Sequence, residues 1–134
     1  MKEMVLENKK DNLEKILLEI ENALSKYTLS LKSKFQLELV IEEIFVNIAD
    51  YAYEDVGEII IKYDVTENPL KFKMVFIDNG IKFNPIELNC PDISLNADER
   101  DIGGLGFLLI RKNIDNIKYK YENNQNILTI EKIF

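Results

Sequence analysis

Histidine is missing from the sequence, and cysteine occurs once, as Cys90. Histidine is the commonest general base near neutral pH and the commonest metal ligand. Any chemistry on this chain must therefore use carboxylates, amides, lysines or backbone groups, and phosphohistidine chemistry is excluded. A lone cysteine cannot form a disulfide within the chain and argues against a cysteine-based metal site.

The sequence also lacks a long apolar run and a basic stripe. No stretch approaches the ~20 consecutive apolar residues that span a bilayer, and the first residues, MKEMVLENKKDN, are too polar for a signal peptide. We therefore expect a cytoplasmic protein with no membrane contact. The 24 acidic residues outnumber the 17 basic ones, so the net charge is −7 and no nucleic-acid partner is expected. A protein partner or a small ligand fits this charge better.

Glycine and proline are scarce, with five and three residues, and no repeat or low-complexity segment interrupts the chain. Apolar residues make up 46% of the sequence and charged residues 31%, as in an ordinary globular protein. A length of 134 residues is typical of one domain, ~100 to 150 residues. We expect a single domain over residues 1–134.

Apolar residues at helical spacing predict the helices. The first helix is expected within residues 11–27. The second covers residues 30–55, contains neither glycine nor proline, and has apolar residues over more than half of its circumference, which predicts a buried central helix. A third helix is expected over residues 106–116, opening directly after a glycine cluster. A long loop, residues 78–106, precedes it, and such loops in compact domains are often functional.

Runs of β-branched and aromatic residues predict two antiparallel hairpins and a short first strand. The expected strands cover residues 4–7, 58–65, 71–78, 117–122 and 126–133, and the second hairpin turns around residues 123–126. Two hairpins with interposed helices cannot form an all-parallel sheet. The sequence therefore predicts the α+β class: a two-layer α/β sandwich, with a mixed, mainly antiparallel sheet and helices on one of its faces.

The central helix carries a first polar pair. Glu43 and Asn47 are four residues apart, so both project from one face of the helix and can share a ligand. A solvated helix face is the ordinary explanation of such a pair. The functional alternative is that the Asn47 carbonyl oxygen binds Mg²⁺ and that Glu43 orients or deprotonates a nucleophile one turn away.

Asp78, Asn79 and Gly80 follow the apolar strand residues KMVFI. A carboxylate at a strand end can accept a hydrogen bond from an exocyclic amine, and an adjacent glycine lets a flat base approach the backbone. The adenine N6 amino group fits this description. An ordinary Asp-Asn or Asn-Gly turn explains the same residues without a ligand.

Gly103, Gly104 and Gly106 precede the apolar residues FLLI. Glycines before a helix N-terminus leave backbone N–H groups and the positive end of the helix dipole available to an anion such as polyphosphate. A flexible connection is the simpler alternative.

Taken in this order, EEIFVNIADYAY, DNGIKFNP and DIGGLGFLLIRK resemble the N, G1 and G2 boxes of the GHKL ATPases and kinases, the superfamily of Hsp90, gyrase B, MutL and the histidine kinases. The resemblance covers residues 31–134 and implies the Bergerat fold, with ATP and Mg²⁺ as cofactors. It is strongest to the anti-sigma-factor serine/threonine kinases, because DNGIKFNP lacks the second glycine of the DxGxG form and has phenylalanine and Asn-Pro instead.

This resemblance implies a role for each residue that matches a family motif. Glu43 corresponds to the catalytic base and Asn47 to the Mg²⁺ ligand. Asp78 corresponds to the aspartate that binds adenine, and Gly80 to its glycine.

The remaining matches lie toward the C-terminus. Gly104 and Gly106 correspond to the phosphate-loop glycines, Thr129 to a threonine that helps to hold adenine, and Arg100 to a phosphate contact from the ATP lid. Tyr51 departs from the pattern, because related kinases often carry histidine four residues after the N-box asparagine.

Two functions follow from the resemblance. The first is a serine/threonine protein kinase that phosphorylates a STAS-domain anti-anti-sigma protein and sequesters a sigma factor. The second is a nucleotide-gated regulatory module that binds a partner without efficient phosphoryl transfer. Glu43 favours the first and Tyr51 leaves room for the second. A homodimer is implied by the resemblance as well.

Overall fold

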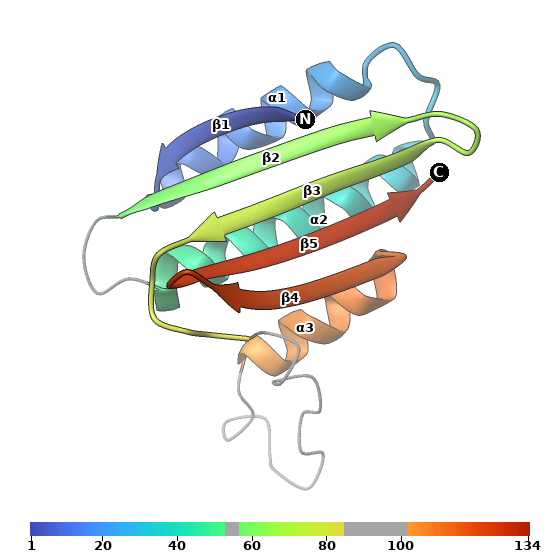
Figure 1. Cartoon of the computed structure of the whole chain (residues 1–134). Helices are drawn as coiled ribbons and strands as arrows, with labels where there is room; N and C mark the ends of the chain where they lie inside the picture. Colours follow the sequence, from blue (N-terminus) through green and yellow to red (C-terminus); the bar gives the residue numbers. More distant parts are fainter. Residues whose placement is uncertain (53–56, 85–101) are drawn as a thin grey trace, which may run out of the picture.

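The computed structural model describes residues 1–52, 57–84 and 102–134. Three helices and five strands make up most of this part of the chain (Figure 1). The helices are α1 (Leu13–Leu24), α2 (Leu31–Asn47) and α3 (Ile102–Asn113), and the strands are β1 (Lys2–Glu7), β2 (Glu58–Thr66), β3 (Lys71–Asp78), β4 (Asn116–Glu122) and β5 (Gln125–Ile133). A short 3-10 helix, η1 (Lys10–Asn12), precedes α1, and a π-helical segment, η2 (Ile48–Ala52), continues α2.

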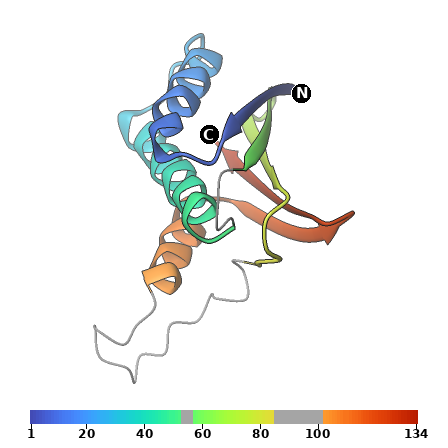
Figure 2. The same cartoon turned by 90° about the vertical axis from the view of Figure 1, so that its left-hand side faces the viewer.

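The strands form one sheet in the order β1-β2-β3-β5-β4, and each of these four pairings is antiparallel. All three helices lie on the same side of this sheet (Figure 2). The predicted α+β sandwich, with a mainly antiparallel sheet and helices on one face, is confirmed, but the sheet was expected to be mixed and its described pairings are all antiparallel. The strand order also brings β5 next to β3, so residues from the middle of the sequence become neighbours of residues near its C-terminal end.

The core lies between the helices and the inner face of the sheet. Strand residues alternate between buried and more exposed, and the hydrophobic members of the buried set are Ile59, Ile61, Tyr63, Phe72, Met74, Phe76, Leu128 and Ile130. The helices contribute buried side chains about one turn apart, such as Ile16 and Ile20 of α1 or Ile41 and Phe45 of α2. Each such side chain contributes about 1.5–3 kcal/mol when fully buried.

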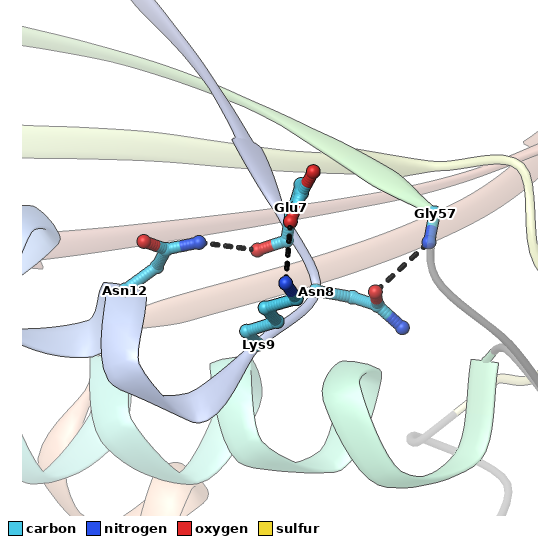
Figure 3. A network of polar contacts seen from close by, with 5 residues as sticks. All are labelled: Glu7, Asn8, Lys9, Asn12 and Gly57. Atoms are coloured by element: carbon cyan, nitrogen blue, oxygen red, sulfur yellow. Dashed lines mark hydrogen bonds and ion pairs between the residues drawn. The ribbon is translucent and has the colours of Figure 1, made fainter.

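A network of polar contacts fixes the corner between β1 and α1 (Figure 3). Asn8 is bonded to Gly57 twice: its backbone N–H donates to the Gly57 carbonyl at 2.9 Å, and its Oδ1 accepts from the Gly57 N–H at 2.9 Å. The Asn12 side chain donates to the Glu7 carbonyl at 2.9 Å, and Lys9 pairs with the Glu7 carboxylate at 3.1 Å. The chain therefore enters β2 at a fixed place beside the end of β1.

The helix limits differ from the prediction at two places. The central helix was expected to continue to residue 55, but regular α-helix ends at Asn47 and the next five residues are π-helical. A π-helical turn contains more residues than an α-helical one, so residues beyond Asn47 leave the expected face. Asp50 accordingly points outward and pairs with Lys10 at 3.0 Å. The third helix begins earlier than expected, at Ile102, and includes the glycines.

The second hairpin turns more tightly than predicted. Asn123 and Asn124 alone form the turn, with φ angles of 54° and 61°, and Glu122 pairs with Gln125. Positive φ at both central residues is the signature of a type I′ hairpin turn, which asparagine tolerates. Asn126 therefore belongs to β5 and not to the turn.

Candidate functional site

Asp78 occupies an inward position at the end of β3. It continues the buried face of Phe72, Met74 and Phe76, and only 4% of its surface is exposed. A carboxylate in such a place is costly unless it is hydrogen-bonded. Its Oδ1 accepts from the Gly80 N–H at 3.0 Å and from the Asn126 side-chain amide at 2.9 Å.

The second carboxylate oxygen, Oδ2, makes no hydrogen bond to the described residues. Burial raises the pKa of Asp78, while the hydrogen bonds from Asn126 and Gly80 lower it. Asp78 thus combines a fixed orientation with an acceptor oxygen that is available to a ligand. Gly80 contributes to the site by donating its backbone N–H to Asp78.

A pocket lies between the helices and this end of the sheet and includes Asp78. Its cavity volume is about 30 Å³, which is below the ~300–1,000 Å³ of typical small-molecule pockets. Most of its wall is apolar or aromatic, and a few polar groups converge on it. The lining residues are Ile44, Asn47, Ile48, Asp78, Phe83, Ile110, Tyr119, Asn126 and Leu128.

Of the polar pair Glu43 and Asn47 on α2, Asn47 lines this pocket. Asn47 is the last residue of α2 and lines the pocket, so the structure brings Asn47 and Asp78 to one cavity. Its side-chain amide donates to Glu43 Oε1 at 3.3 Å. Because Asn47 donates through nitrogen, its carbonyl oxygen is directed elsewhere. Glu43 itself is half-buried one turn earlier and is not part of the pocket wall.

Asn126 is a residue of this site that the sequence analysis missed. It lies directly opposite Asp78 in the β3–β5 pairing and is 5% exposed. The period-two pattern of β5 contains the signal that would identify it, because Asn126 shares its face with Leu128 and Ile130. The predicted strand 126–133 contained this pattern, but the resemblance to the family singled out Thr129 and not Asn126.

The prediction for Thr129 needs correction. Thr129 is three positions from Asn126 on β5, and an odd shift along a strand moves a side chain to the other face of the sheet. It therefore faces away from the helices, among residues such as Lys73 and Lys118, and does not line the pocket that contains Asp78. In this structure Asn126 stands where Thr129 was expected.

The predicted phosphate-binding residues are placed only in part. Gly104 and Gly106 lie within the first turns of α3, not before it, although helix interiors disfavour glycine by about 1 kcal/mol relative to alanine. Further along α3, Ile110 is fully buried and forms part of the pocket wall. α3 thus runs from the glycines to the pocket. Arg100 lies outside the described residues.

The site offers one side-chain oxygen that suits Mg²⁺, the carbonyl oxygen of Asn47. In residues 1–52, 57–84 and 102–134, no group of three or more Cys, Asp or Glu side chains could hold a metal ion. Mg²⁺ usually takes one or two protein ligands and completes its octahedron with water and phosphate oxygens, so a single amide oxygen from Asn47 fits it.

None of the helices within residues 1–52, 57–84 and 102–134 is long and apolar enough to cross a membrane.

Residues 6–132 match the sequence model of the histidine kinase-like ATPase domain family. The chain therefore belongs to this family, which confirms the resemblance to the GHKL ATPases and kinases.

Similar proteins include serine-protein kinases. The serine-protein kinase RsbW of Bacillus cereus (strain AH820) is 32% identical over 102 residues, which cover 72% of this chain and 62% of that protein. RsbW of Listeria monocytogenes serotype 4a (strain HCC23) is 28% identical over 103 residues, covering 72% of this chain and 64% of the relative. The chain thus matches a little over three-fifths of the length of these relatives.

Solved structures support the same fold. The RsbU and RsbW domains of Rv1364c from Mycobacterium tuberculosis match 99% of this chain and 33% of that one, with a TM-score of 0.66 and 9% identity. The catalytic domain of the histidine kinase ThkA matches 99% and 98%, with a TM-score of 0.51 and 14% identity.

Proposed function

We propose that this protein is an ATP-binding serine/threonine protein kinase of the anti-sigma-factor type, which phosphorylates a STAS-domain anti-anti-sigma protein and sequesters a sigma factor. The observation that supports it most is Asp78, a buried carboxylate in a mainly apolar pocket, whose Oδ2 makes no hydrogen bond to residues 1–52, 57–84 or 102–134. Burial of a carboxylate is costly, and a ligand amine would add a hydrogen bond at the second oxygen, Oδ2. The similarity to serine-protein kinases favours phosphoryl transfer.

Each lining group has a part in this proposal. Asp78 Oδ2 would accept a hydrogen bond from the adenine N6 amine, and the apolar walls would cover the faces of the base. Asn47 would offer its carbonyl oxygen to Mg²⁺, and the ion would offset the negative charge on the transferred phosphoryl group. Gly104 and Gly106 at the start of α3, and Arg100, would contact the phosphates.

Glu43 would act on the nucleophile. Its carboxylate is one turn from Asn47 and in contact with it, so a serine hydroxyl beside the metal would lie close to both. Removal of the hydroxyl proton by a positioned base typically contributes 10²- to 10⁴-fold.

A specific observation favours the alternative, a nucleotide-gated binding module without efficient transfer. Glu43 lies outside the pocket wall and accepts a hydrogen bond from Asn47, an arrangement that could serve only to hold Asn47. Both versions of the proposal include a cytoplasmic location and a homodimer.

Glu43→Gln tests the two alternatives. Glutamine keeps the size of the side chain and can still accept from Asn47, but it cannot take a proton. We expect ATP affinity to change little and phosphoryl transfer to fall at least tenfold, since a loose transition state limits the contribution of the base. The measurement is single-turnover transfer of label from saturating ATP with Mg²⁺ to a STAS-domain protein. An unchanged rate would remove Glu43 from catalysis, and a wild-type protein that binds ATP but transfers nothing would favour the binding module.

A further inference from the structure

The side-chain amide of Asn126 is completely used inside the protein. Nδ2 donates to Asp78 Oδ1 at 2.9 Å and to the Ile81 carbonyl at 3.0 Å. Oδ1 accepts from the Phe83 N–H at 3.0 Å and from the Tyr119 hydroxyl at 2.5 Å. An amide can form four such bonds, two through each end, and Asn126 makes all four.

These partners fix which way the amide points. If nitrogen and oxygen were exchanged, the amide nitrogen would face the Phe83 N–H and the oxygen would face two other acceptors, Asp78 Oδ1 and the Ile81 carbonyl. Because the Phe83 N–H and the Ile81 carbonyl are backbone groups, their polarity cannot change. Asn126 therefore always presents a donor to Asp78, and Asp78 must respond as an acceptor.

We propose that Asn126 is a positioning residue that sets the base selectivity of the pocket: by holding Asp78 as a charged acceptor, it makes the site favour a 6-amino purine over a 6-oxo purine. This inference rests on the proposed nucleotide binding. The Oδ2 atom of Asp78 attracts an exocyclic amine and repels a carbonyl oxygen in the same place, so the carboxylate selects for one base and against the other.

Loss of the Asn126 donor would weaken this selection. Its hydrogen bond is one of two that lower the pKa of Asp78 against the effect of burial. Without it, a protonated Asp78 becomes easier to form, and a protonated carboxyl group can donate to a 6-oxo group.

The other end of the amide acts on affinity and not on selectivity. Its bonds to Ile81 and Phe83 hold the segment after β3 against β5, and the Phe83 side chain lines the pocket. A loosened pocket wall would reduce contact with either base equally. A purely structural role of Asn126 thus predicts weaker binding of both nucleotides with an unchanged ratio, whereas the positioning role predicts a changed ratio.

Two variants of matched shape separate these roles. Asn126→Val removes every hydrogen bond of the side chain, and Asn126→Thr has the same shape but keeps a hydroxyl that can donate to Asp78. Thr129→Val makes the same Thr-to-Val exchange on the opposite face of β5 and serves as the control. The probes are ADP and IDP with Mg²⁺, and their affinities are measured by calorimetric titration. The two purines differ at position 6, an amine in ADP and a carbonyl in IDP, and at the adjacent N1, which carries a proton only in IDP.

We expect the wild-type protein to bind ADP at least tenfold more tightly than IDP. Asn126→Val should lower ADP affinity about 10- to 100-fold and reduce the ADP preference about tenfold. Asn126→Thr should keep the preference within about threefold of wild type, and Thr129→Val should match wild type in both affinity and preference. An Asn126→Val protein that binds ADP more weakly but with the full preference would overturn the inference while leaving the proposed function intact. A wild-type protein that binds neither nucleotide would overturn both.

A measurement on the wild-type protein covers the case in which the variants do not fold. The side-chain amide protons of Asn126 should exchange with solvent at least tenfold more slowly than those of Asn123 and Asn124, which are exposed in the turn two residues away. ADP should slow this exchange further. Exchange as fast as in the turn, with and without ADP, would contradict a fixed amide.

Discussion

Asp78 destabilises the folded protein at neutral pH while it prepares the site for a ligand. Its pKa is raised by burial, so the folded protein retains this proton to a higher pH than the unfolded chain does. Below about pH 4, the unfolded pKa of an aspartate, the carboxyl group is neutral in both states and burial of charge costs nothing. The cost appears as the pH rises through the folded pKa, and it is complete above that value.

Asp78→Asn should remove this cost. An asparagine carbonyl can still accept from Gly80 and Asn126 at the place of Oδ1. The asparagine side chain is neutral at every pH between 4 and 7. We expect the variant to gain free energy of unfolding, relative to wild type, as the pH rises from 4 to 7. Urea denaturation of both proteins at the two pH values measures the difference. A relative stability that falls over this range would show that the carboxylate is better paired than its surroundings indicate.

Asn47 should matter for the metal and not for the base. Asn47→Ala removes the carbonyl oxygen assigned to Mg²⁺, and it leaves Asp78 and the apolar walls in place. We expect the variant to bind ATP with Mg²⁺ at least tenfold more weakly than wild type does, and to bind ATP in the presence of a chelator almost normally. Equal losses in the two titrations would make Asn47 a packing residue.

At the residue scale, motifs identified Asp78 and Asn47 because a motif states which residue type stands at which position. They could not identify Asn126 or place Thr129, since both depend on which face of β5 a side chain occupies. The apolar residues of the predicted strand 126–133 fall on both faces, with Ile127 and Ile133 on one and Leu128 and Ile130 on the other, so the pattern alone does not say which face packs against the helices. Asn126, the hydrogen-bond partner of Asp78, is identified only from the pairing of β3 with β5.

At the scale of elements, the two ends of α2 have different roles: the first end stabilises the helix through a cap, and the last residue lines the pocket. Its first turn is capped by Ser30, whose hydroxyl accepts from the Ser33 N–H at 3.1 Å, and its last residue is Asn47. Seventeen residues at ~1.5 Å each separate these ends by roughly 25 Å. A change at the first end can therefore alter stability without touching the pocket.

Ser30→Ala is expected to lower the free energy of unfolding by about 1 kcal/mol, the usual cost of losing such a cap. In a domain of this size that corresponds to a fall in Tm of roughly 2–5 °C. ATP affinity at 25 °C should stay within about twofold of wild type. Thermal denaturation and calorimetric titration check the two parts, and a large loss of affinity would mean that the helix transmits changes from its N-terminus to Asn47.

The elements themselves were largely predictable. Both hairpins and all three helices were expected from apolar periodicity, because period two and period 3.6 are determined by local backbone geometry. The end of α2 and the start of α3 were not. The π-helical turn after Asn47 has no simple sequence signature, and a helix that includes Gly103, Gly104 and Gly106 contradicts local propensity.

At the scale of the whole molecule, the site exists because of the strand order. β5 lies between β3 and β4, so Asp78 and Asn126, which are 48 residues apart, stand opposite each other, and Tyr119 of β4 reaches the same pocket. α2 and α3 then close the pocket from the other layer through Asn47 and Ile110. Sequence patterns predicted the layers but not this order, which depends on long-range pairing.

Binding of ATP through Asp78 is the central claim, and a titration of the wild-type protein and Asp78→Asn with ATP and Mg²⁺ tests it most directly. The matched control is Asp64→Asn, the same exchange at an exposed position of the neighbouring strand β2. We expect wild type and Asp64→Asn to bind ATP equally. Asp78→Asn should bind about 10- to 100-fold more weakly, since it loses a charge-assisted hydrogen bond of ~1.5–3 kcal/mol. Wild-type affinity in a folded Asp78→Asn protein would contradict the claim.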